Sequence, residues 1–107
     1  MIKIFVIFIT VFGVSFGLEE CFKKAAFKYN VPLPLLLAIA KVESNFNVNA
    51  LNKNRNGTYD IGIMQINTSN LSLLKRVGII KRDEELWIPC KNVEAGAYIL
   101  KLCIKRH

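Results

Sequence analysis

The stretch PLLLAIAKVES, residues 34–44, decides how we expect the chain to fold. Its side chains are apolar on nearly every side from Leu35 to Ala40, which is typical of a helix buried at the centre of a bundle. Pro34 suits the first turn of such a helix, where the missing backbone N–H removes no hydrogen bond. The pattern therefore predicts a central helix that runs to about Ser44.

Helical spacing continues on both sides of this stretch. Residues 19–29 place apolar side chains on one face and lysines on the other, and Asn30 is expected to end this first helix. Residues 69–77 predict a short helix that stops at Gly78. Amphipathic spacing of this kind indicates helices that pack against the central one.

The chain closes with another helix, for which Asn92 is the expected N-cap. Pro89 is expected to hold the chain extended just before it. Residues 45–59 contain six asparagines, which predict a loop or a short irregular hairpin with no clear strand signal, and residues 81–85 are charged and expected to be solvated. The fold class is therefore mainly α, all-α or nearly so, in one domain at residues 18–107.

The first 17 residues differ in kind from the rest. A single Lys3 precedes an apolar run at residues 4–12, and the small residues Ser15 and Gly17 follow. This order predicts a secretory signal peptide, residues 1–17, with an uncleaved membrane anchor as the alternative. We therefore expect the protein to be exported to the periplasm or cell envelope, with membrane contact only through this segment.

The three cysteines would then meet an oxidising compartment. A bridge between Cys21 and Cys90 would close most of the domain into one loop, which in the chain-entropy model stabilises the fold by about 4 kcal/mol. Cys103 is left over in this interpretation. The alternative is three buried, unpaired thiols.

Composition excludes several classes of function. The only histidine is His107, so no Ser/His or Cys/His nucleophile pair is available, and the cysteine spacing offers no metal site. No glycine pattern typical of nucleotide binding occurs, so no cofactor is expected. The chain has 15 Lys and Arg against 8 Asp and Glu, a formal charge of +7 spread along its length. Such a charge favours a polyanionic wall or membrane surface over a nucleic acid in an exported protein.

Glu43 is the carboxylate that stands apart. It follows Ile39 by four residues, which carries it onto a face continuous with apolar side chains. Desolvation there would disfavour its charged form and suit it to general acid catalysis. A structural hydrogen-bond acceptor or a capping group is the alternative reading of the same residue.

Two short motifs carry a resemblance to a known family. Glu43-Ser44-Asn45-Phe46 with Ala50, and Gly62-Ile63-Met64-Gln65-Ile66-Asn67, resemble the Glu-Ser-x-Phe and Gly-Leu-Met-Gln motifs of the soluble lytic transglycosylase and goose-type lysozyme superfamily. The Asn-rich segment and the positions of Cys21 and Pro89-Cys90 are similar to the small secreted transglycosylases that accompany bacterial secretion and conjugation machines. The likeness spans roughly residues 18–107.

The resemblance implies a lysozyme-like fold and cleavage of the β-1,4 bond between N-acetylmuramic acid and N-acetylglucosamine in peptidoglycan. Glu43 matches the family's acid, which then serves as the base in forming a 1,6-anhydromuramoyl product. Gln65 and Asn67 match substrate-binding positions, with hydrogen bonds that fix their loop as the alternative. Ser44 is expected to contact substrate or orient Glu43, with capping of the helix end as the alternative. Asp60 is expected to bind substrate or anchor its loop, and as a water-activating base it would give a hydrolytic lysozyme instead.

One departure from the family concerns the C-terminus. Members typically continue into a further helix with a Tyr-Asn motif, whereas this sequence ends at residues 105–107. The resemblance therefore implies a C-terminally short core, and a non-catalytic wall-binding or remnant domain is the second hypothesis. The expected partners are peptidoglycan strands and an envelope-spanning secretion or conjugation apparatus, with the protein itself a monomer.

Overall fold

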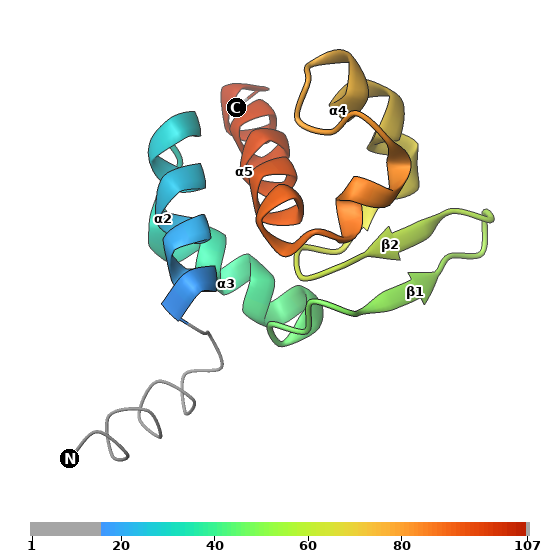
Figure 1. The fold of residues 1–107 in the computed structure, drawn as a ribbon, viewed down its shortest axis with the longest axis horizontal. Helices are drawn as coiled ribbons and strands as arrows, with labels where there is room; N and C mark the ends of the chain where they lie inside the picture. Colours follow the sequence, from blue (N-terminus) through green and yellow to red (C-terminus); the bar gives the residue numbers. More distant parts are fainter. Residues whose placement is uncertain (1–15, 107) are drawn as a thin grey trace.

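The computed structural model describes residues 16–106 and shows a mainly helical domain with one small sheet (Figure 1). The mainly α fold class is thereby confirmed. The predicted signal peptide lies outside the described residues except for Phe16 and Gly17, which begin the first helix. Across residues 16–106, no helix is both long and apolar enough to span a bilayer.

Two helices form the first half of the core. Helix α2 covers Phe16–Tyr29 and helix α3 covers Leu33–Ser44, close to the predicted bounds. On α3, Leu36 and Ala40 are fully buried. The prediction of a helix buried at the centre of a bundle was wrong for one side of α3, because Leu35 is 42% exposed and Val42 is 83% exposed.

The Asn-rich segment contains the first strand, and the start of the second, of a three-stranded antiparallel sheet. Strand β1 (Leu51–Lys53) pairs with β2 (Tyr59–Ile61), and β2 pairs with β3 (Ile66–Asn67). The hairpin alternative is confirmed, whereas the expectation of no strands was wrong. Strands of three residues or fewer are too short to show an alternating pattern, and side-chain hydrogen bonds such as that from the Thr58 N–H to Asn56 Oδ1, at 3.0 Å, hold the turn.

The second half of the chain contains α4 (Leu71–Arg76) and α5 (Pro89–Arg106), with the short 3₁₀ segments η1 (Thr68–Asn70) and η2 (Asp83–Trp87) before them. The expected extended approach at Pro89 was wrong, because Pro89 is the first residue of α5. This position suits proline, whose fixed φ fits a helix and whose missing N–H is unneeded there.

Asn92 is therefore not an N-cap but an interior residue of α5 that is 1% exposed. Its Nδ2 donates to the carbonyl oxygens of Ile61 and Leu86, both at 2.9 Å, and its Oδ1 accepts from the Met64 N–H at 2.8 Å. A buried amide with three partners is stable where an unpaired one would be costly. Asn92 thus fastens the loop after β2 to α5.

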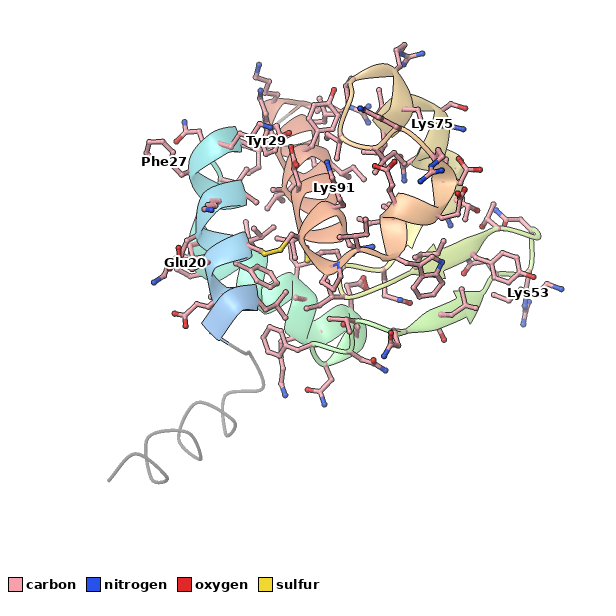
Figure 2. All side chains as sticks on the ribbon, in the orientation of Figure 1. Glu20, Phe27, Tyr29, Lys53, Lys75 and Lys91 are labelled. Carbon is pink, nitrogen blue, oxygen red and sulfur yellow. A yellow bond between two sulfur atoms is a disulfide. The ribbon has the colours of Figure 1, made fainter. Side chains whose placement is uncertain are left out.

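The core around Asn92 is apolar. A disulfide joins helices α2 and α5 beside it. Cys21 on α2 is bonded to Cys90 on α5 as expected, with Cα atoms 5.3 Å apart, and Figure 2 shows the yellow bond between the two helices. Cys103 is free and exposed. The largest fully buried apolar side chains are Phe22, Leu36, Ile63, Leu74, Ile80, Leu86 and Val93.

A polar cluster also connects α2 and α5. The Glu94 carboxylate accepts hydrogen bonds from Lys28 Nζ and from the Tyr29 hydroxyl, each at 2.7 Å. Burial alone would raise the pKa of Glu94, but these two bonds outweigh it and hold the pKa below its ordinary value of 4.5. Burial, together with the bond to Glu94, raises the pKa of Tyr29 to about 12, and the bond to Glu94 raises the pKa of Lys28.

These shifts predict how the cluster's stabilising effect depends on pH. The pKa of Glu94 is lowered on folding, so its contribution is present above about pH 4.5 and is lost as the pH falls through the lowered value. The pKa values of Lys28 and Tyr29 are raised, so their contributions are present below pH 10 and are lost as the pH rises through the raised values.

For Glu94→Gln we expect the free energy of unfolding at neutral pH to fall by about 0.5–1 kcal/mol, since Lys28 is largely exposed. Urea unfolding across a pH series measures the effect. The difference from wild type should shrink on acidification through the lowered pKa of Glu94, and two parallel stability curves would contradict the prediction.

Candidate functional site

Glu43 occupies the last turn of α3 beside a shallow hollow of about 300 Å³, lined also by Ala38, Ile39 and Val42. The predicted apolar neighbours are therefore present. The predicted burial is not, because Glu43 is exposed. Among residues 16–106 its carboxylate has no hydrogen-bond or ion-pair partner, so it is open to a ligand.

Ser44 fixes the end of the helix that carries Glu43. Its Oγ donates to the Ile63 carbonyl oxygen at 2.7 Å and accepts from the Asn47 N–H at 3.1 Å. The chain then leaves α3 with positive φ values at Asn45 and Phe46, 54° and 62°. Ser44 thus ties the first sequence motif to the second, and its contacts favour positioning Glu43 over binding a ligand.

The second motif is anchored to the first at another point. The Gly62 N–H donates to the Ala50 carbonyl oxygen at 2.8 Å, and Gln65 Nε2 donates to the same oxygen at 3.3 Å and to the Gly62 carbonyl oxygen at 2.9 Å. Gln65 Oε1 accepts from Asn52 Nδ2 at 2.6 Å. The amide of Gln65 is therefore occupied by the loop around it.

Gln65 also has a positive φ of 51°, a conformation that non-glycine residues rarely adopt. Backbone strain of this kind persists only where surrounding contacts hold it. Here the contacts made by the Gln65 side chain supply that restraint, so its identity matters to the shape of the loop.

Asp60 and Asn67 form a pair across β2 and β3. Asn67 Nδ2 donates to Asp60 Oδ1 and to Thr58 Oγ1, both at 2.9 Å, while Asn67 Oδ1 accepts from the Ser69 N–H at 2.9 Å. This bonding favours the interpretation of Asp60 as an anchor of its loop.

The two motifs predicted from sequence thus meet in space through Ser44 and Ala50. The sequence did not predict that Asn52 donates a hydrogen bond to Gln65. It also did not predict that Asn92 is bonded to the backbone of the loop after β2. The only signal for Asn52 was the abundance of asparagine in residues 45–59, whereas the position of Asn92 indicated an N-cap instead. In the described part of the chain, no group of three His, Cys, Asp or Glu side chains is placed to hold a metal ion.

Comparison with known proteins agrees with this arrangement. Residues 20–107 match the family model of the transglycosylase SLT domain. Protein IpgF of Shigella flexneri is 42% identical over 98 residues, which cover 90% of this chain and 62% of that protein. Invasion protein IagB of Salmonella typhimurium (strain SL1344) is 36% identical over 101 residues, covering 94% and 62% respectively.

A third relative is the peptidoglycan-binding-like protein of Escherichia coli O157:H7, 36% identical over 105 residues that cover 92% of this chain and 63% of the relative. The chain spans just over three-fifths of the length of these curated relatives. The match to the family model covers both motifs and every described helix and strand from α3 to α5, together with α2 from Glu20 onward. The chain therefore belongs to the transglycosylase SLT domain family.

Proposed function

We propose that this domain cleaves the β-1,4 bond between N-acetylmuramic acid and N-acetylglucosamine in peptidoglycan and releases a 1,6-anhydromuramoyl end. The observation that carries the proposal is the Glu43 carboxylate, which has no partner among residues 16–106 and lies at a surface hollow, at the end of a helix fixed by Ser44. Family membership supports the substrate class.

One carboxyl group is sufficient for this reaction. Protonated Glu43 donates its proton to the glycosidic oxygen as the bond to the anomeric carbon breaks. The resulting carboxylate then accepts the proton of the muramoyl 6-hydroxyl, whose oxygen closes on the anomeric carbon. The substrate's acetamido group stabilises the cationic centre between the two steps, as in substrate-assisted glycosidases.

The remaining predicted residues act around Glu43. Ser44 positions the end of its helix, and Gln65 holds the loop to which Ser44 is bonded. The side-chain amides of Gln65 and Asn67 are suited to sugar hydroxyl and acetamido groups. When substrate binds, they exchange hydrogen bonds within their loop for hydrogen bonds to the sugar. Asp60 orients Asn67 through the bond at 2.9 Å.

The names of the relatives support the setting of the reaction. One relative is called a peptidoglycan-binding-like protein and another an invasion protein. We place the domain in the periplasm or cell envelope, where it opens the wall for an envelope-spanning secretion or conjugation apparatus. No metal or cofactor takes part in the proposed steps.

Product analysis tests this proposal. Purified sacculi are incubated with the full chain in heavy-oxygen water, and the released fragments are identified by mass spectrometry. We expect anhydromuramoyl ends without heavy oxygen, because no water enters the reaction.

Two other outcomes would contradict the proposal. Reducing ends carrying heavy oxygen that disappear in Asp60→Asn would support a hydrolytic lysozyme with Asp60 as base. Sedimentation with sacculi and no released fragment would support a non-catalytic wall-binding domain.

A further inference from the structure

The seam between α2 and α5 carries positive charge that the proposed reaction does not use. Lys91, Lys101 and Lys105 follow one another at helical spacing on α5, in the same stripe as Glu94 and Tyr98. This stripe is turned toward α2, because Glu94 is bonded to Tyr29 and the Tyr98 ring lies 5.7 Å from the Tyr29 ring. With two lysines of α2 it forms a surface that we call the α2–α5 basic face: Lys24, Lys28, Lys91, Lys101 and Lys105.

Most of this charge is not neutralised within the protein. Among residues 16–106, Lys28 is the only member of the face with an ion pair, to Glu94. Lys24 and Lys28 line a groove of about 290 Å³ between the helices. The face has five lysines, and of the described carboxylates only two, those of Glu20 and Glu94, line the groove beside them.

An aromatic side chain stands at the edge of the same face. Phe27 is 91% exposed, more than any other large apolar side chain in the described region, and it points away from the helices in Figure 2. Lys23, Lys24 and Lys28 neighbour it on α2. A phenylalanine ring surrounded by lysines gains little in water, whereas at a bilayer surface the ring enters the acyl boundary and the ammonium groups remain at the headgroups.

We propose that the α2–α5 basic face and Phe27 bind an anionic phospholipid bilayer. The lysines supply the attraction to phosphate headgroups, and Phe27 supplies an apolar contact at the acyl boundary. This surface lies on α2 and α5, whereas Glu43 lies on α3. The proposal therefore stands independently of the proposed glycan cleavage, and it adds a bilayer contact outside residues 1–17.

Vesicle sedimentation with the full chain tests the proposal. Binding is measured to vesicles of phosphatidylglycerol mixed with phosphatidylcholine and to vesicles of phosphatidylcholine alone. The apolar residues at the N-terminus are the same in every variant, so the ratio of the two affinities isolates the contribution of charge. We expect this ratio to be large for wild type and to fall as salt is added.

The test variant is Lys24→Gln, Lys91→Gln, Lys101→Gln, and the matched control is Lys53→Gln, Arg55→Gln, Arg76→Gln, which removes the same charge elsewhere on the surface. At about fivefold per lysine, we expect the test variant to lose about 100-fold in affinity for anionic vesicles and the control to lose less than tenfold. Phe27→Ser should lose about tenfold on both vesicle types.

Equal vesicle binding by the test and control variants would overturn the proposal. Loss of sacculus binding by the test variant with no loss of vesicle binding would also overturn it and would assign the face to the wall. Release of anhydromuramoyl fragments should be the same in the test variant and in wild type. Failure of bilayer binding can therefore be distinguished from failure of glycan cleavage.

Discussion

Glu43→Gln is expected to reduce the release of anhydromuramoyl fragments by about 10³-fold while leaving the fold intact. Glutamine has the shape of the acid but neither donates a proton to the glycosidic oxygen nor accepts one from the 6-hydroxyl, and general acid–base catalysis of this kind contributes 10²–10⁴-fold. Since Glu43 is exposed and has no partner within residues 16–106, its loss leaves no buried group unpaired.

The matched control is Glu84→Gln, the same substitution at a glutamate whose side chain is 76% exposed and far from α3 in the sequence. Its turnover should equal that of wild type. Thermal unfolding followed by circular dichroism should give the same midpoint for all three proteins. If Glu43→Gln retained wild-type turnover, another group would have to be the acid.

Gly62→Ala is expected to lower the free energy of unfolding by about 3–5 kcal/mol. Gly62 has a φ of +78°, and a Cβ there would lie 2.5 Å from Asn92 Nδ2. Asn92 is held by three hydrogen bonds and is 1% exposed, so it has no room to give way without losing those bonds.

The chain offers a control that separates the cost of the positive φ from the cost of the close contact with Asn92. Gly78 has a φ of +83° but no atom within 4 Å of a Cβ, so Gly78→Ala tests the backbone conformation alone. We expect that variant to lose about 1 kcal/mol. Urea unfolding measures the free energy of unfolding of both variants. Equal decreases would contradict the prediction, because they would show that the contact with Asn92 does not destabilise Gly62→Ala.

The helices could be predicted because their signal is local. The spacing of apolar side chains on α2 and the proline near the start of α3 are read within one element, and both helices lie where the sequence indicated. The two motifs at the candidate site were likewise visible, since each is a short continuous run.

What escaped prediction depends on residues distant in the chain. Asn92 has the side chain of an N-cap, but Pro89 begins the helix three residues earlier, and the true partners of Asn92 are up to 31 residues away. The exposure of Glu43 and Val42 depends on which elements cover α3, and no periodicity within α3 contains that information. Strands β1 to β3 pair through their backbones and are too short to show an apolar pattern of their own, while asparagine side chains fix the turn between β1 and β2.

The bond between Cys21 and Cys90 closes the chain between these residues, which are 69 positions apart in the sequence, into a covalent ring. The hairpin turn next to Arg55 is exposed and rich in small polar residues, the sort of site at which proteases nick a folded chain. A single cut there would open the ring without releasing a fragment, because both pieces would still be joined through sulfur. The nicked protein would keep α3 and α5 in one molecule and could regain its structure after unfolding, as long as the compartment remained oxidising.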